Sequence, residues 1–395
     1  MININNVSVV FGKQPERALA LMDQGLGRDA IKEQTGLVLG VQEANLRVER
    51  GEICVLMGLS GSGKSSLLRC INGLNSVTRG EVCIEHEGSS IDFAAADSKT
   101  QQDIRTNRVS MVFQSFALMP WLTVEENIAF GLRQQNLSKT ELKRRIEQQL
   151  TLVGLEEWRS AYAHELSGGM RQRVGLARAL ATESDILLMD EPFSALDPLI
   201  RHQLQEELLE LQTTLRKTIV FVSHDLDEAL KLGNKIVIMK DGQIVQQGRP
   251  EQIILSPADD YVKTFVANTN PLNTLQAQSV MTHLKDTPAD ANNNLCVSKR
   301  YDIWVMTQDN LADTQVTMAG KTYQTQSWQP GQPIDALQKL PTCIPGRTPM
   351  RDAVEICYVT GHNILVEQNG QLTGTIGERE IYHTLLSKHL ADDLL

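Results

Sequence analysis

The sequence lacks long apolar runs. No uninterrupted stretch approaches the roughly 18–20 residues that a membrane-spanning helix needs, and the first residues do not have the pattern of a signal peptide. We therefore expect a soluble chain that does not cross a membrane. Basic charge is also scarce, because 38 Lys and Arg stand against 48 Asp and Glu, for a formal net charge of −10. Phosphate backbones bind basic surfaces, so this balance argues against a nucleic-acid partner.

Cysteines are few and irregularly spaced. None of them forms the C-x-x-C pattern of a zinc or redox site, which suits a reducing cytoplasm and excludes a disulfide framework. The six are Cys54, Cys70, Cys83, Cys296, Cys343 and Cys357. In other respects the composition, 41% hydrophobic and 22% charged over 395 residues, is that of a globular protein with two or three domains.

Residues 58–66 match the phosphate-loop pattern G-x-x-x-x-G-K-S/T. The loop follows an apolar run at 53–57 and precedes a helix-compatible run at 65–71, which is the setting this pattern needs. Backbone N–H groups in such a loop converge on a β-phosphate at the positive end of the helix. Lys64 adds charge for the β- and γ-phosphates, and Ser65 adds a hydroxyl for Mg²⁺. The residues predicted to bind the nucleotide here are Gly58, Leu59, Ser60, Gly61, Ser62, Gly63, Lys64, Ser65 and Ser66.

Two more apolar strands end in polar side chains. The strand at 186–189 is of the buried parallel type and leads into Asp190 and Glu191. Asp190 could hold the water shell of Mg²⁺ while Glu191 polarises the attacking water; the alternative is a capping pair for the next helix. The strand at 218–222 leads into Ser223 and His224. Taken alone, this histidine would be structural.

The segment before the phosphate loop is predicted as a strand at 2–11, short helices at 16–23 and 29–34, and a strand at 41–48. Phe11 ends the first strand, where it is either a core residue or a platform for an adenine base. After the loop, residues 80–84 are predicted as an edge strand. Residues 115–121 are too apolar for a solvated loop and indicate a partner surface.

Two helices start with capping signals. Ser138, with Glu141 three residues later, begins a helix whose apolar stripe we interpret as core packing. Ser167, Gly168 and Gly169 begin another helix, where free N–H groups form a second anion site.

Together these motifs resemble the ATP-binding subunit of an ATP-binding-cassette (ABC) transporter, over about residues 1–270. The matching elements are the phosphate loop, Gln114 as the Q-loop residue, the signature at 166–170, the Walker B pair Asp190 and Glu191, the D-loop at 194–197 and the switch histidine His224. The resemblance implies an α/β P-loop ATPase fold with a RecA-like core, an antiparallel β subdomain and a helical subdomain at about 115–180. ATP and Mg²⁺ are the implied cofactors.

The resemblance also implies the role of each residue. Glu191, His224 and Gln114 would be catalytic, and Ser65, Gln114 and Asp190 would hold the metal. ATP would contact the phosphate loop and also Phe11, Ser167, Gly168, Gly169 and Asp197. In this family two such domains enclose two ATP molecules, so that the signature of one subunit completes the phosphate loop of the other. A homodimer at the cytoplasmic face of the membrane is implied, together with permease subunits and, indirectly, a substrate-binding protein.

A finer resemblance is to importers of quaternary amines, namely glycine betaine, proline betaine and choline. It rests on Gly40 and Val41, the insertion between Phe11 and Val41, and the runs at 113–120, 194–201 and 224–229. The alternative class is a soluble cassette ATPase acting on nucleic acid or the ribosome. The single nucleotide domain, the acidic charge and the lack of a long heptad run argue against that alternative.

The remainder, 271–395, is predicted as a linker over 268–294 followed by a small α+β domain. Residues 348–389 resemble a cystathionine-β-synthase (CBS) motif, with an Asn369-Gly370 hairpin turn and a final helix at 379–389. Its partner module, at 280–340, matches weakly. Gly377 and Glu380 stand where the motif has Thr or Ser and Asp, so packing or dimerisation is our first interpretation and adenine-nucleotide sensing our second.

Overall fold

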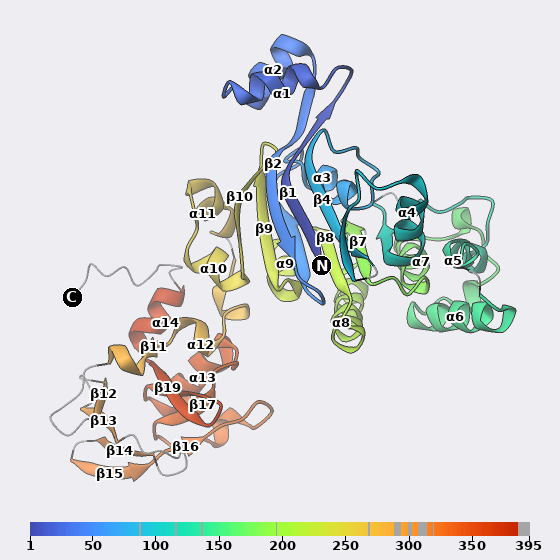
Figure 1. Ribbon diagram of the computed structural model, residues 1–395. Helices are drawn as coiled ribbons and strands as arrows, with labels where there is room; N and C mark the ends of the chain where they lie inside the picture. The colour runs from blue at the N-terminus through green and yellow to red at the C-terminus, as the bar shows by residue number, and fades with distance from the viewer. Residues whose placement is uncertain are drawn as a thin grey trace. The chain divides into compact units, whose positions relative to one another are not determined.

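The computed structural model describes the chain except at residues 87, 115–116, 136, 195, 268, 288–293, 299–301, 307–313, 319 and 386–395. The chain forms two compact units, Met1–Arg249 and Pro250–Leu395, whose elements are drawn in Figure 1. The boundary predicted at residue 270 falls inside the second unit. No described helix has the length and apolarity that crossing a bilayer requires.

The first unit is organised around a six-stranded sheet in the order β10-β9-β3-β8-β7-β6. All pairs are parallel except β10 with β9. Every residue of β3, β7 and β8 is buried, as expected for parallel strands covered on both faces. The strands are β3 (Ile53–Met57), β6 (Val109–Val112), β7 (Ile186–Asp190), β8 (Thr218–Val222), β9 (Lys235–Lys240) and β10 (Gln243–Gly248).

A second, antiparallel sheet has the order β2-β1-β4-β5. Its strands are β1 (Ile2–Phe11), β2 (Val38–Val48), β4 (Arg79–His86) and β5 (Ser89–Asp92). The prediction of an edge strand at 80–84 is wrong, because β5 continues the sheet and leaves β4 between β1 and β5. Helix α3 (Lys64–Ile71) shares one core with both sheets, built from residues such as Leu67 and Ile71.

Helices α1 (Glu16–Asp23) and α2 (Arg28–Thr35) form a small hairpin beyond the ends of β1 and β2, as Figure 1 shows. Both were predicted from the turn and proline pattern. They enclose a small core of their own, formed by Val10, Ala18, Met22, Ile31, Leu37 and Leu39. Asp23 at the end of α1 accepts a hydrogen bond of 2.8 Å from Arg79 of β4, which fastens the hairpin to the antiparallel sheet.

A helical layer contains α5 (Val124–Leu132), α6 (Lys139–Leu152) and α7 (Gly168–Ala181), with a core of its own. The α6 stripe is in this core, as predicted. The Ser138 hydroxyl accepts a hydrogen bond from the Glu141 N–H at 3.2 Å, so this helix start is also confirmed. The remaining elements of the unit are α4 (Ser98–Asp103), the π-helix η1 (Ile104–Arg108), the 3-10 turns η2 (Glu156–Trp158) and η3 (Ala163–Glu165), α8 (Pro198–Leu215) and α9 (Leu226–Leu232).

The second unit contains a five-stranded sheet in the order β11-β19-β18-β17-β16. The predicted hairpin and the start of the predicted final helix are present, and Asn369 and Gly370 both have positive φ, as a tight hairpin turn requires. The elements are α10 (Pro250–Leu255), α11 (Asp260–Val266), η4 (Pro271–Asn273), α12 (Ala277–Val280), β11 (Thr282–His283), η5 (Leu284–Asp286), β16 (Gln326–Ser327), η7 (Ile334–Ala336), β17 (Thr342–Pro345), α13 (Met350–Thr360), β18 (Ile364–Gln368), β19 (Gln371–Ile376) and α14 (Glu378–Leu385).

The described residues of the segment predicted as a linker include regular structure. Within 268–294, β11 pairs with β19, and Leu275 and Ala277 are buried. The pairing and these two apolar side chains attach the described part of this segment to the second unit. The module at 280–340 contains a further antiparallel sheet of β12 (Leu295–Ser298), β13 (Ile303–Met306), β14 (Gln315–Met318) and β15 (Lys321–Gln324). Helix α14 is described to Leu385; the rest of the predicted helix lies outside the described residues.

Candidate functional site

The phosphate loop joins β3 to α3, and two of its glycines are required by close approach. Gly58 has φ +141° and Gly63 has φ +102°, which L side chains rarely adopt. A Cβ at Gly58 would collide with the Met239 carbonyl oxygen, and one at Gly63 with the Gly40 carbonyl oxygen. The loop can therefore pack against the neighbouring backbone only as a glycine-rich segment.

The donors of this loop fit a phosphate group. Lys64 Nζ lies inside the loop and donates to the carbonyl oxygens of Gly58 and Leu59, each at 2.9 Å. Burial lowers the pKa of the Lys64 ammonium, and the nearby carboxylates of Glu191 and Asp190 oppose that shift. The Ser62 hydroxyl is buried and has no partner among the described residues. A bound phosphate would satisfy this hydroxyl and the free N–H groups at the start of α3.

Asp190 ends β7 directly beside α3. Its carboxylate is fully buried and accepts hydrogen bonds from Ser65 Oγ at 2.6 Å and Arg69 Nη2 at 2.8 Å. The structure thus brings together Ser65 and Asp190, two of the predicted metal ligands, and hydroxyl and carboxylate oxygens suit Mg²⁺. Sequence reasoning missed Arg69. Its spacing of four from Ser65, which places both on one face of α3, was the available signal.

Glu191 lies between the other two predicted catalytic residues. Its Oε2 accepts a hydrogen bond from Gln114 Nε2 at 3.0 Å and lies 3.8 Å from His224 Nδ1. The Glu191 backbone has φ +50°, a strained conformation for this residue type, and its N–H donates to the Val222 carbonyl at 3.1 Å. Three strand ends, those of β6, β7 and β8, therefore converge on one carboxylate.

A small pocket behind His224 contains a buried acid that sequence reasoning missed. Glu228, on α9, accepts hydrogen bonds from Ser223 Oγ and from Gln205 Nε2, the latter at 3.0 Å. Arg201, at the start of α8, pairs with Asp225 at 3.4 Å. These contacts hold the loop that carries His224, and Glu191 lines the same pocket. The only available signal was the position of Glu228 one helical turn after the histidine.

The signature and D-loop residues are placed by helix starts. Ser167 caps α7 by accepting from the Met170 N–H at 3.3 Å, and it lies in the helical layer, whose core is separate from that of the phosphate loop. Asp197 caps α8 by accepting from the Ile200 N–H at 3.1 Å. Ala195, within the predicted D-loop, lies outside the described residues. The structure therefore assigns each of these side chains a local capping contact.

Phe11 is 42% exposed, so it is not a core residue. Its ring contacts Gly40, where a Cβ would collide with it, and the Gly40 carbonyl in turn packs against Gly63 of the phosphate loop. The Phe11 ring therefore offers an accessible face close to the phosphate loop, where an aromatic ring could stack on a base.

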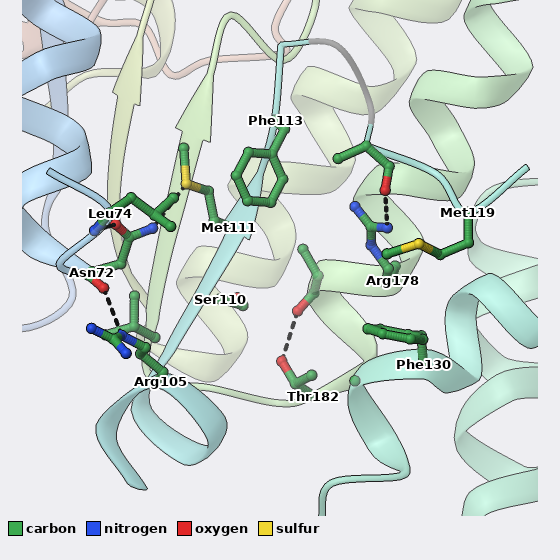
Figure 2. Close-up of a pocket in the computed structure, with 14 residues that line it drawn as sticks. Asn72, Leu74, Arg105, Ser110, Met111, Phe113, Met119, Phe130, Arg178 and Thr182 are labelled. Carbon is green, nitrogen blue, oxygen red and sulfur yellow. Dashed lines mark hydrogen bonds between the residues drawn. The ribbon is translucent and has the colours of Figure 1, made fainter. Parts of the chain in front are cut away.

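A mainly apolar cavity of about 410 Å³ lies beside the loop that follows Gln114, as Figure 2 shows. Arg178 of α7 donates to the Ala117 carbonyl at 2.7 Å and so connects α7 to that loop. Ser115 and Phe116, earlier in the same loop, lie outside the described residues. The cavity is lined by Asn72, Leu74, Arg105, Val109, Ser110, Met111, Phe113, Ala117, Met119, Phe130, Gly131, Arg178, Ala179 and Thr182.

The fold and this site define a P-loop ATPase of the cassette class. The family description "ABC transporter" matches residues 41–194. The chain is 48% identical over 279 residues to the glycine betaine/proline betaine transport system ATP-binding protein ProV of Escherichia coli, covering 71% of this chain and 69% of that protein. It is 47% identical over 281 residues to the glycine betaine transport ATP-binding protein OpuAA of Bacillus subtilis, covering 71% and 66%.

Solved structures agree with these relatives. A dimeric bacterial ABC transporter cassette superposes with a TM-score of 0.55 at 31% identity, covering 63% of this chain and 99% of that one. A post-hydrolysis state of the same cassette, bound to ADP and Pi, gives a TM-score of 0.54 at 30% identity over the same shares. The chain belongs to the family of ABC transporter ATP-binding proteins. It is an ATPase, and the predictions of the ABC family and of the P-loop ATPase fold are confirmed.

The buried acid behind His224 should make stability depend on pH. Burial raises the pKa of the Glu228 carboxyl above its ordinary value of 4.5, so the folded chain keeps this proton to higher pH than the unfolded chain does. The resulting stabilisation is present below 4.5 and is lost as the pH rises through the folded pKa. Glu228→Gln should remove this dependence, as measured by urea unfolding at a series of pH values.

The matched control is Glu210→Gln, which changes an exposed acid on α8. This variant should follow the parent at every pH. Parallel pH profiles for the parent and Glu228→Gln would contradict the assignment.

Proposed function

We propose that this chain hydrolyses ATP to power the import of a quaternary amine osmoprotectant through membrane permease subunits. The candidates are glycine betaine, proline betaine and choline. The observation that carries the proposal is the identity of 44–48% to proteins named for the transport of glycine betaine, proline betaine or carnitine. Further relatives, at 44% identity, are named for trimethylamine N-oxide transport. The compounds in these names share a methylated, positively charged nitrogen.

The site geometry supports a division of roles. Glu191 orients and polarises the attacking water, while Gln114 and His224, which both lie next to its Oε2, position that carboxylate and sense the γ-phosphate. Ser65 and Asp190, with Gln114, would hold Mg²⁺, which supplies positive charge to the phosphate oxygens when bound. The phosphate loop binds the α- and β-phosphates, and Phe11 stacks on the adenine.

The permease is proposed to dock at the apolar cavity beside residues 117–122. Trp121 and Phe130 are 69% and 42% exposed, which is unusual for side chains of this size. Arg178 joins this loop to α7, and α7 begins at the signature residue Ser167. A movement of the permease at the cavity would therefore be transmitted to the signature residues through helix α7. This arrangement would keep the chain peripheral, at the cytoplasmic face of the membrane.

A homodimer is proposed to complete each nucleotide site. Ser167, Gly168 and Gly169 present the free N–H groups at the start of α7, which suit a γ-phosphate. They belong to a layer separate from the phosphate loop, so the phosphate loop of a second subunit is their natural partner. The similar solved cassette is described as dimeric.

The second unit is proposed to pack and dimerise rather than to sense a nucleotide. Both carboxylate oxygens of Glu380 are engaged within the unit, one by Thr282 Oγ1 at 2.7 Å and the other by the Gly377 N–H at 2.8 Å. A Cβ at Gly377 would lie 2.6 Å from the Asn363 amide, so a Thr or Ser there would displace this side chain from its hydrogen bond to the Val297 carbonyl. Tyr358 and Tyr382 are exposed and available for contacts.

The function is tested in proteoliposomes that contain the permease, the substrate-binding protein and this chain. Glycine betaine, proline betaine or choline should raise the ATPase rate, whereas a chemically unrelated solute such as sulfate should not. Glu191→Gln should retain ATP binding and lose turnover by about 10²- to 10⁴-fold, the usual contribution of a general base. Lys64→Ala should instead weaken ATP binding. Hydrolysis by Glu191→Gln within a few-fold of the parent would refute the role of Glu191.

The composite site is tested by mixing two inactive chains. Lys64→Ala and Ser167→Arg should each be inactive as homodimers, while the mixed dimer has one intact phosphate loop facing one intact signature. ATPase activity should therefore appear on mixing. As a control, Lys64→Ala mixed with a chain that carries both substitutions should remain inactive. If mixing the single variants restores nothing although mixed dimers form, the trans arrangement is wrong.

The second unit is tested on the full-length Lys64→Ala chain, in which the nucleotide site of the first unit is silenced. Calorimetric titration of this chain with AMP or a cyclic dinucleotide should show no saturable binding in the micromolar range. Removal of residues 271–395 should weaken self-association in sedimentation experiments. Saturable binding would instead favour the nucleotide sensor.

A further inference from the structure

The helical hairpin of α1 and α2 contacts the phosphate loop directly. Arg28, the first residue of α2, donates from Nη1 to the Gly61 carbonyl oxygen at 2.8 Å. The hairpin ends before residue 41, where the family match begins, so it is not part of the common cassette motif set. None of the roles assigned above uses this contact.

The carbonyl groups of two consecutive loop residues, Gly61 and Ser62, accept hydrogen bonds from segments outside the loop. The Ser62 carbonyl accepts a hydrogen bond from the Gly242 N–H at 3.0 Å, in the turn between β9 and β10. The same turn is fixed in place by the Gln42 N–H, which donates to the Gly242 carbonyl at 2.8 Å. Segments far apart in the sequence, at 28 and 242, therefore hold adjacent peptide groups of the loop.

Holding a carbonyl also orients the amide of the next residue. In a trans peptide the C=O and the next N–H point in opposite directions. A donor outside the loop on the Gly61 carbonyl therefore directs the Ser62 N–H inward, and the Gly242 contact does the same for the Gly63 N–H. In agreement, the Ser62 N–H points to the Leu59 carbonyl at 3.2 Å, one of the two carbonyls that Lys64 Nζ contacts inside the loop.

We propose that Arg28 is a positioning residue, which preorganises the phosphate loop by holding the peptide between Gly61 and Ser62 with its N–H inward. The α1–α2 hairpin holds Arg28 in position. The small apolar core around Ile31 and the Arg79–Asp23 ion pair hold α2 in place. The Arg28 guanidinium is therefore fixed within hydrogen-bonding distance of the Gly61 carbonyl. An inward N–H favours binding of the β-phosphate, because the loop does not need to reorganise when the nucleotide arrives.

The test compares equilibrium binding of ATP and ADP to the full-length chain, together with steady-state kinetics. Arg28→Ala should raise the Kd of both nucleotides by about 3- to 10-fold, the lower range for a charge-assisted hydrogen bond at a partly exposed site. KM should rise accordingly while kcat stays within about twofold, because the catalytic carboxylate is untouched. Arg28→Lys keeps a charged donor and should lie between the parent and Arg28→Ala.

Two further variants separate positioning from simpler effects. Arg17→Ala removes the same charge from an exposed position on α1 and should leave the Kd unchanged. Asp23→Ala removes the ion pair that fastens the α1–α2 hairpin and does not alter the phosphate loop. It should raise the Kd of both nucleotides, as Arg28→Ala does. The thermal unfolding midpoint of each variant, measured in parallel, should remain near that of the parent.

Two results would overturn the inference. If Arg28→Ala binds nucleotides as Arg17→Ala does, the contact is incidental. If Arg28→Ala weakens ATP but not ADP, Arg28 touches the γ-phosphate and does not position the loop. The inference rests on the proposed nucleotide site, which Lys64→Ala tests separately. Loss of binding in Lys64→Ala but not in Arg28→Ala would refute the positioning role alone, whereas unchanged binding in Lys64→Ala would refute the site itself.

Discussion

The parallel pairing of β3, β8, β7 and β6 is the constraint on which the rest of the structure depends. Parallel strands end at the same edge of a sheet, so the residues immediately after each strand are brought to one place. The phosphate loop comes after β3, and the carboxylates Asp190 and Glu191 lie at the end of β7. A register shift of one residue in β7 would turn Asp190 away from Ser65 and dismantle the site.

Around this edge, four outer segments hold the loops. The α1–α2 hairpin and the β9–β10 turn hold the phosphate loop, and α8 and α9 hold the loop that carries His224. Their contacts are single hydrogen bonds and one ion pair, of the kind that orients groups without contributing much to stability. The positions of the site residues are therefore fixed by several individually weak contacts around a buried parallel sheet.

The helical layer is attached differently. Its core is separate from that of the sheets, and Arg178 links α7 to the loop after Gln114. Separate cores permit small relative movements, because the side chains within each layer remain packed. If the permease docks at the cavity as proposed, such a division would let the signature and that surface move together while the phosphate loop remains fixed to its sheet.

Local patterns determined much of this protein from the sequence alone. The apolar runs before Gly58, Asp190 and Ser223 predicted buried strands, and the short helices at 16–23 and 29–34 followed from proline and glycine positions. The order of the motifs identified the family, since each depends on residues close together in the chain. Polar composition predicted a linker at 268–294, and the sequence did not indicate that Leu275 and Ala277 within it are buried.

Only the tertiary structure decided which distant residues meet. The contacts of Arg69 with Asp190, of Gln205 with Glu228 and of Arg28 with Gly61 each join elements whose separation in the sequence says nothing about their distance in space. The tertiary structure also moved β4 from the predicted edge into the interior of its sheet, because strand order depends on which later segment pairs with it. Local conformation depends on residues that are neighbours in the chain, so the sequence indicates it. Hydrogen bonds between distant segments depend on how the helices and strands pack, which only the tertiary structure shows.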